Sequence, residues 1–468
     1  MKKYILRKKF IGAFALFSFF ITLPAFAVLQ NINVSDVADT VITGPEEVSL
    51  TPIKVGDING DGKEDIAIVH ASTPSTVASL FFAPLHSAQY SLENADATIT
   101  STQTSNGSYV VAGIGDVNGD GYDDLSVSNP SYRESSGALS IFYGPIHSSI
   151  DLSQANQQII GKTGSQFGSA IALAGDVNAD GYDDILVGAP PKLNTRTQGI
   201  TYLLLGPSFP TLDNAIQFTS QLQYNAVGTA MASAGDVNGD GYDDILIGDS
   251  LAMDQSGVAY IFYGSDTIQS SAIENAPLTL IGPRSGLAGS AVASAGDVNA
   301  DGYDDILIGA WCTGGRLKRQ QDYYQCGEGS AYIVHGAPSL PTSIMLENSA
   351  AASVYGNHKG AALGIFVGSA GDVNADGYDD IFVGSPWEDV NKIESAGALY
   401  LIHGPLQGKI DLADSQVTPY VGKEILDQVG TAAFTADIDG NTTADIIFDI
   451  TGEQYPYPAS DSIYIIKK

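Results

Sequence analysis

Beyond residue 27 the chain alternates short apolar runs with polar turns. The runs are four to eight residues long and rich in Ile, Val, Leu, Tyr and Phe, as in Asp244–Gly248, Val258–Gly264 and Pro277–Gly282. Gly, Asp, Asn, Pro and Ser separate them, which is the chemistry of strands and turns. No later segment shows a sustained apolar period near 3.6 residues with helix caps, so the pattern predicts an all-β protein with little helix.

The runs form a repeat that occurs seven times. Its acidic motif begins at Asp57, Asp116, Asp176, Asp236, Asp297, Asp372 and Asp437, with spacings of 59, 60, 60, 61, 75 and 65 residues. Each copy holds four runs, here called A to D in chain order, which predict one four-stranded antiparallel blade. Blades arranged around an axis bury their faces against each other, so we predict a single seven-bladed β-propeller over residues 28–468.

The two ends of the chain predict how the ring closes. Asp461–Lys468 matches strand C of the seventh copy. Ala38–Gly44 resembles the D strands at Ala97–Thr102, Gln157–Lys162 and Gln416–Gly422. We therefore expect the N-terminal strand to complete the last blade. An open solenoid is the alternative, but it would have to protect exposed strand edges.

The acidic motif predicts calcium binding. It reads D-x-N-x-D-G-x-x-D in six copies. Side-chain oxygens at positions one, three, five and nine, with a backbone carbonyl at position seven and a Gly for the sharp turn, surround one hard cation, and calcium suits such flexible oxygen ligation. We expect about six to seven ions. The predicted ligands are Asp57, Asn59, Asp61, Lys63, Asp65, Asp116, Asn118, Asp120, Tyr122, Asp124, Asp176, Asn178, Asp180, Tyr182, Asp184, Asp236, Asn238, Asp240, Tyr242, Asp244, Asp297, Asn299, Asp301, Tyr303, Asp305, Asp372, Asn374, Asp376, Tyr378, Asp380, Asp437, Asp439, Asn441 and Asp445.

Two other interpretations fit the motif less well. An EF-hand or a dockerin-like module needs a Glu at position twelve and flanking helices. Position twelve is Ile or Val in the six complete copies, so a β-hairpin turn between runs A and B fits better. Asp, Asn and Gly also form turns without any ion, but clustered carboxylates repel one another unless a cation is present. The seventh copy lacks the Gly and has Asn441 at position five, so we expect it to bind weakly or not at all.

Charge and the first residues place the protein outside the cell. Residues 1–27 have a basic start, an apolar run and Ala25-Phe26-Ala27, which predicts a cleaved secretory signal peptide rather than a membrane anchor. Cleavage removes five of 21 basic residues and leaves 16 against 53 acidic ones, a net charge of −37 instead of −32. Such a surface repels nucleic acid and anionic membranes. No later run is long enough for a transmembrane helix. We expect a monomer that is secreted, periplasmic or on a bacterial cell surface.

The fifth copy carries the long insertion, Trp311–Gly329, between runs B and C. It contains Cys312 and Cys326, which we expect to form a disulfide in an oxidising compartment, since two thiols alone cannot fill a zinc shell. Aromatic and basic residues typical of binding hot spots gather there and at the same connection of the sixth copy. The candidate ligand-binding residues are Trp311, Arg316, Lys318, Arg319, Tyr323, Tyr324 and Trp387. A surface loop stapled against proteases is the alternative.

The repeat resembles the FG-GAP repeats of integrin α heads and of many secreted bacterial proteins. Its best copy runs from Phe167-Gly168 through the acidic loop to Gly188-Ala189-Pro190. The resemblance implies a seven-bladed propeller with calcium in hairpins on one face and ligand contact on the opposite face. Other copies replace FG, as at Val227-Gly228, Ala288-Gly289 and Leu363-Gly364. In integrins, aromatic residues near those positions help hold a partner β subunit, so the departures put such a partner in doubt.

No catalytic residue is predicted. The sequence contains no nucleophile motif, phosphate loop or zinc pattern. His335 and His403 stand where sister copies have Tyr143 and Tyr263, which indicates variants of one strand position. The leading hypothesis is a module that binds an extracellular protein or glycan in adhesion. A glycan-acting lyase or hydrolase with a site on the upper face, opposite the calcium, is the alternative.

Overall fold

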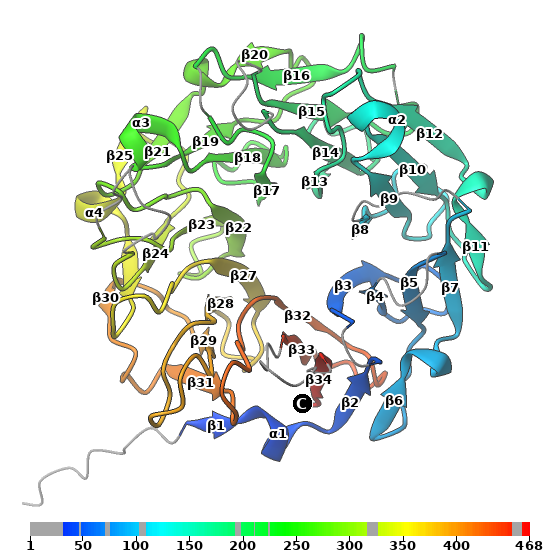
Figure 1. The fold of residues 1–468 in the computed structure, drawn as a ribbon. Helices are drawn as coiled ribbons and strands as arrows, with labels where there is room; N and C mark the ends of the chain where they lie inside the picture. The colour runs from blue at the N-terminus through cyan, green and yellow to red at the C-terminus, as the bar shows by residue number, and fades with distance from the viewer. Residues whose placement is uncertain are drawn as a thin grey trace, which may run out of the picture.

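Seven small sheets stand around a central axis (Figure 1). The computed structural model describes residues 31–45, 48–70, 75–102, 109–191, 198–209, 211–222, 225–315, 326–451 and 461–468. The predicted signal peptide, residues 1–27, lies outside this part of the chain. Strands dominate the described residues, which confirms the all-β, seven-bladed prediction.

Each blade runs from an inner A strand to an outer D strand, in chain order. The first blade contains β3 (Thr51–Gly56), β4 (Asp65–Val69), β5 (Thr76–Phe81), β7 (Ala97–Thr100) and β11 (Ile150–Asp151). The second contains β8 (Val110–Gly113), β9 (Leu125–Asn129), β10 (Ala138–Phe142) and β12 (Gln157–Ile160). The third contains β13 (Ala170–Gly175), β14 (Asp184–Ala189), β15 (Ile200–Leu204), β16 (Ile216–Thr219) and β20 (Ser271–Ala272). The fourth contains β17 (Ala230–Gly235), β18 (Asp244–Asp249), β19 (Val258–Phe262), β21 (Leu278–Ile281) and β25 (Ser343–Met345).

The remaining three blades follow the same order. The fifth contains β22 (Ala291–Gly296), β23 (Asp305–Ala310), β24 (Ser330–Val334), β26 (Ala352–Tyr355) and β30 (Gly408–Ile410). The sixth contains β27 (Phe366–Gly371), β28 (Asp380–Ser385), β29 (Ala398–Ile402), β31 (Val417–Val421) and β1 (Ile32–Asn33). The seventh contains β32 (Ala433–Ala436), β33 (Asp445–Ile450), β34 (Ser462–Ile466), β2 (Thr40–Thr43) and β6 (Gln89–Ser91).

Six blades carry a fifth strand that the sequence did not predict. It is two or three residues long, pairs parallel with strand D, and comes from the connection that precedes strand D of the next blade. Neighbouring blades are therefore stitched together at the outer edge. Short helical turns follow these strands or lie in B-to-C connections. They are α1 (Val34–Val37), η1 (Leu92–Asn94), α2 (Tyr132–Ser135), η2 (Leu152–Gln154), α3 (Ala252–Gln255), η3 (Ile273–Asn275) and α4 (Leu346–Ser349).

The N-terminal segment closes the ring, as predicted. Strand β2 pairs antiparallel with β34, with Thr40 opposite Ile465 and Thr43 opposite Ser462. Strand β1 adds parallel to β31 of the sixth blade. Residues 32–43 thus supply both the D strand and the stitching strand that the seventh repeat needs, and Figure 1 shows them between the sixth and first blades.

The hydrophobic core lies between the blades. Buried side chains in the described residues form seven clusters, each drawn from two neighbouring blades. Strand β23 is buried at every position because neighbours cover both of its faces, whereas β22 beside the axis is mostly half-buried. This explains why the B runs are continuously apolar, while the A runs are rich in small residues that fit where the blades converge.

Candidate metal sites and the opposite rim

The acidic motifs form the A-to-B hairpins, all at one end of the ring. In five blades the A strand bulges one residue before its terminal Gly, as between Leu173 and Gly175, and the motif starts at the next residue. The prediction of β-hairpin turns is confirmed, and EF-hand helices are absent from the described hairpins. We call this end the hairpin face.

The Asp at position one organises each hairpin. In the second blade, Asp116 Oδ1 accepts the N–H groups of Gly119 at 2.7 Å and Asp120 at 3.1 Å, and Oδ2 accepts that of Gly121 at 2.8 Å. Bonds from positions five and six recur in all seven copies at 2.7 to 3.1 Å. The loop is therefore shaped by its own carboxylate before any cation binds.

The Asp at position nine is fully buried in all seven hairpins. Its Oδ1 accepts the N–H that follows strand C, as from Gly144 to Asp124 at 2.8 Å and from Gly264 to Asp244 at 2.8 Å. In the first five hairpins burial raises the pKa of this carboxyl, and the carboxylates at positions five and one raise it further; in the seventh, burial raises the pKa of Asp445, and Asp439 and Asp437 raise it further. The pKa is about 7 for Asp65, Asp124, Asp184, Asp244 and Asp305, and about 6 for Asp445.

Each hairpin thus brings one buried carboxyl next to further acids of the same loop. In the first hairpin, Asp65 Oδ2 is buried without a hydrogen-bond partner, and Asn299 Oδ1 of the fifth is likewise unpartnered. Carboxylate and amide oxygens are the ligands of a hard cation. The residues present therefore fit calcium. The carbonyl group at position seven stays a predicted ligand.

The seventh hairpin keeps the same shape despite its altered sequence. Thr442, which replaces the Gly at position six, adopts a φ of 72°, where the six glycines have φ from 82° to 92°. Asp437, Asp439 and Asp445 each offer an oxygen within 4.8 Å of the others. An extra carboxylate at position three thus offsets the loss of the one at position five. Weak binding there stays a prediction.

The acid at position eight has a role that sequence reasoning missed. Its carboxylate reaches back to the preceding blade and accepts the N–H of position one, as from Asp116 to Asp183 at 2.8 Å. We call each such bond a latch. Six latches are present, at 2.6 to 3.1 Å. Written as accepting carboxylate and donating N–H, they are Asp123 and Asp57, Asp183 and Asp116, Asp243 and Asp176, Asp304 and Asp236, Asp379 and Asp297, and Glu64 and Asp437. The signal was visible: six copies carry an acid that the ligand pattern does not use.

One hairpin has a histidine behind it. His403 Nδ1 lies 2.8 Å from Asp380 Oδ2 in the sixth blade, while His335 Nε2 of the fifth lies 3.0 Å from the carbonyl oxygen of Leu406. Both rings therefore contact elements of the fold, as expected for variants of one strand position.

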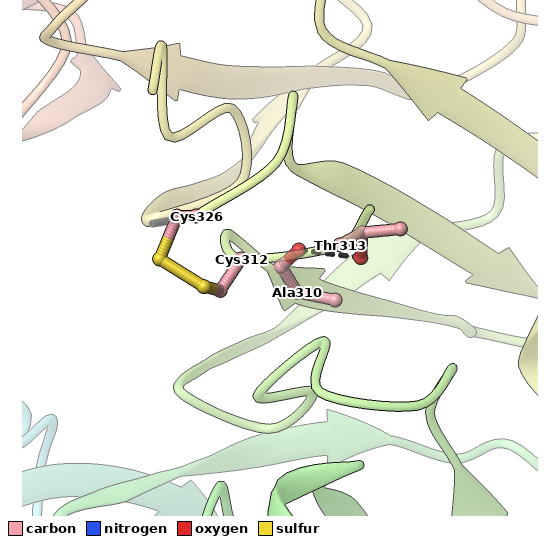
Figure 2. Close-up of a disulfide and its surroundings, with 4 residues drawn as sticks. All are labelled: Ala310, Cys312, Thr313 and Cys326. Carbon is pink, nitrogen blue, oxygen red and sulfur yellow. Dashed lines mark hydrogen bonds between the residues drawn. A yellow bond between two sulfur atoms is a disulfide. The ribbon is translucent and has the colours of Figure 1, made fainter. Parts of the chain in front are cut away.

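Both tryptophans lie on the opposite face, in B-to-C connections. Trp311 and Trp387 meet edge to face with centroids 6.0 Å apart, and Trp387 is 39% exposed. The predicted disulfide between Cys312 and Cys326 is present (Figure 2). Beside it the Thr313 hydroxyl donates to the carbonyl oxygen of Ala310 at 2.8 Å. The other candidate ligand-binding residues, Arg316, Lys318, Arg319, Tyr323 and Tyr324, lie outside the described residues.

A buried carboxyl lies behind the tryptophan pair. Glu388 accepts a bond from the Ser385 hydroxyl at 3.0 Å, and burial raises its pKa. His358 Nε2 lies 3.7 Å from Glu388 Oε1 and accepts the N–H of Asp389 at 2.8 Å. We call Trp311, Trp387 and this group the rim. The polar groups bond to Ser385 and Asp389, which lie two residues to either side of Trp387 in the chain.

Architecture and hairpins together define a seven-bladed β-propeller with acidic loops on one face. The FG-GAP repeat family matches residues 109–142, 167–204, 227–262 and 366–402, which are strands A to C of the second, third, fourth and sixth blades. Integrin alpha pat-2 of Caenorhabditis briggsae is 30% identical over 217 residues, 43% of this chain and 17% of that protein. Integrin alpha-8 of Homo sapiens is 32% identical over 217 residues, 44% of this chain and 20% of that protein. The chain carries FG-GAP repeats and is homologous to integrin α chains, as its motifs indicated.

The match extends over only a fifth or less of these relatives' length. Among solved structures, one titled "Structure of Dos1 propeller" aligns with a TM-score of 0.41 and 8% identity, covering 92% of this chain and 95% of that one. Among the described residues, no helix is long and apolar enough to cross a membrane.

Proposed function

We propose that the protein is an exported, calcium-binding propeller that attaches to an extracellular protein or glycan through the rim. Two observations support the two parts of this proposal. Each hairpin places a buried carboxyl at position nine beside more exposed acids, and the rim presents an exposed tryptophan in contact with a second one. Similarity to proteins named integrin alpha is consistent with a binding module.

The calcium part rests on the buried Asp at position nine. A carboxyl with a pKa near 7 pays for its burial at neutral pH unless it is protonated or paired with a cation. Within the described residues, few cationic side chains approach the hairpins. Lys63 Nζ lies 3.8 Å from Asp61 Oδ2, and Lys54 pairs with Glu64 at 2.6 Å. Calcium would supply the missing charge to the ligands at positions one, three, five, seven and nine.

Native mass spectrometry of the purified protein tests this part. In calcium we expect a mass increase of about six to seven ions, lost after dialysis against a chelator. The same measurement with magnesium serves as a comparison, because magnesium demands a stricter octahedral geometry. A mass that does not change with calcium would leave the acids as turn formers only.

The binding part rests on the tryptophan pair. An aromatic side chain that is exposed yet held rigidly contributes large contact area at low entropic cost. Trp387 is 39% exposed, its ring contacts that of Trp311 edge to face, and its backbone N–H donates to the carbonyl oxygen of Ala361 at 3.3 Å.

A binding screen against glycan and cell-surface protein arrays tests the rim. We expect Trp387→Ala to weaken capture by tenfold or more, about 1.4 kcal/mol. Leu222→Ala, another exposed large apolar residue in a different blade, is the matched control and should bind normally. Equal binding by both variants would place the ligand elsewhere. New reducing ends or unsaturated products from a bound glycan would instead indicate the lyase or hydrolase that the sequence left as the alternative.

A further inference from the structure

We infer that the latches couple cation binding in neighbouring hairpins, and that this coupling is interrupted at one place, between the sixth and seventh blades. The inference rests on the proposed calcium binding, and it assigns a positioning role to the acid at position eight.

The latch joins the ligands of one hairpin to the ligands of the next. Asp183 lies between Tyr182, whose carbonyl is a proposed ligand of the third hairpin, and the buried ligand Asp184. Its carboxylate accepts the N–H of Asp116, the first ligand of the second hairpin, at 2.8 Å. Its own N–H donates to the carbonyl oxygen of Asp116 at 3.2 Å. A cation that orders positions seven to nine of the third hairpin therefore also fixes the start of the second.

The reciprocal bond recurs around the ring. Backbone N–H groups at position eight donate to the carbonyl oxygen at position one of the preceding blade in five pairs, at 3.2 to 3.3 Å. Each pair is a two-point contact between backbone segments that carry ligands on both sides. Ordering one segment lowers the entropy cost of ordering the other, so binding at one hairpin favours binding at its neighbour, and the effect is mutual.

In the first five blades the residue before the motif is a Gly that lies against the latch carboxylate, whereas Ala436 precedes the motif of the seventh blade. Gly115 has a φ of 67°, and a Cβ built there would lie 2.1 Å from Asp183 Oδ2. A Cβ built at Gly56, Gly175, Gly235 or Gly296 would likewise lie 2.0 to 2.2 Å from the Oδ2 atom of the position-eight acid in the next blade. The carboxylate thus occupies the space that any side chain would fill.

The sixth hairpin breaks the series. Position eight of the seventh copy is Ala444, which has no carboxylate to offer to the N–H of Asp372. Gly371 has a φ of 64°, close to that of Gly115, but a Cβ there would meet no atom within 4 Å. On the other side of the seventh blade the latch returns, because Glu64 Oε2 accepts the N–H of Asp437 at 3.1 Å. The coupled series therefore runs from the seventh hairpin through the first to the sixth.

Two glycine substitutions separate the latch from backbone strain. Gly115→Ala and Gly371→Ala impose a similar positive φ on alanine, but only the first displaces a latch carboxylate. We would follow hydrogen exchange by mass spectrometry in peptides that cover each hairpin of the full mature chain during a calcium titration. The calcium concentration at which a peptide reaches half of its full protection from exchange, here called the midpoint, reports binding at each hairpin separately.

We expect Gly115→Ala to raise the midpoint of the third hairpin, residues 176–184, by about tenfold although its sequence is unchanged. Gly371→Ala should leave the seventh hairpin, residues 437–445, at the wild-type midpoint. Asp183→Asn, which keeps an acceptor oxygen, should retain part of the coupling, whereas Asp183→Ala should raise the midpoint of the second hairpin. Thermal melts with calcium confirm that each variant is folded.

The outcomes distinguish the coupling from the proposed function. If the wild-type protein gains calcium but Gly115→Ala leaves the third hairpin unchanged, the coupling is wrong and calcium binding stands. An equal shift of the seventh hairpin by Gly371→Ala would also overturn it, because strain alone would then explain both. If the wild type gains no calcium mass and no hairpin titrates, the calcium binding itself is refuted.

Discussion

Replacing Asp244 by Asn should have opposite effects on stability with and without calcium. In the metal-free protein, burial raises the pKa of this carboxyl from 3.8 to about 7. The folded state then holds the proton more tightly than the unfolded state, so folding loses stability as pH rises from about 4 through 7. At about pH 8 the penalty is about 4 kcal/mol.

Asparagine removes that penalty at a smaller cost. Asp244 accepts the N–H of Gly264 at 2.8 Å and that of Val237 at 3.1 Å, and Asn keeps only one acceptor oxygen. Losing one charged hydrogen bond costs about 2 kcal/mol. The metal-free variant should therefore be about 2 kcal/mol more stable than the wild type at about pH 8. In calcium at a hundred times Kd, the wild type gains about 3 kcal/mol that the variant does not, so the variant should then be about 1 kcal/mol less stable than the wild type.

Urea unfolding in calcium and in chelator measures both values, with tryptophan fluorescence and circular dichroism as signals. Asp449→Asn is the matched control, because Asp449 is also buried and accepts the Ala432 N–H at 2.9 Å, but lies outside the hairpins. Its effect should be the same in both solutions. Equal destabilisation by Asp244→Asn with and without calcium would refute the reasoning and favour a turn without an ion.

Three further outcomes are expected. Burial raises the pKa of Asp449 to about 6. The free energy of unfolding should therefore fall by about 3 kcal/mol as pH rises from about 4 through 6, because the folded state holds the proton more tightly than the unfolded state. The Asp449→Asn variant should lack this fall when urea unfolding is measured across the same pH range. Deleting residues 31–44 exposes the edge of β34, so light scattering should detect aggregation, and a monomeric, folded deletion would contradict the closure. Replacing Cys312 and Cys326 by Ser should cost about 3 kcal/mol in unfolding free energy, and no loss would mean that the loop is held by other contacts.

Local chemistry explains what the sequence predicted well. The D strand expected within Ala38–Gly44 is β2 at Thr40–Thr43, and the C strand expected within Asp461–Lys468 is β34 at Ser462–Ile466. Both were predictable because an apolar strand bounded by turn residues carries its pattern within a few positions. The contact of Trp311 with Trp387 follows from the same register, since equivalent connections of adjacent blades lie side by side.

Contacts between blades explain what the sequence did not predict. Strand β11 is only Ile150–Asp151, too short for any alternating pattern, and it exists because β7 of the preceding blade offers a free edge. The latch at Asp183 ends on a backbone N–H that every residue except proline possesses, so no partner side chain identifies it. Such features depend on how far apart the blades stand, which repeat spacing alone does not give.

The seam of the ring shows why cation binding and closure belong together. In the seventh hairpin, Lys468 N donates to Asp445 Oδ1 at 3.0 Å, the bond that sister blades take from the connection after strand C. Asn441 Nδ2 in turn donates to the carbonyl oxygen of Lys468 at 3.0 Å, and Glu64 of the first blade latches to Asp437. A cation held by Asp437 and Asp445 would therefore tighten segments from both ends of the chain at once. Because the sixth and seventh hairpins share no latch, that tightening would pass to the first blade and not backward.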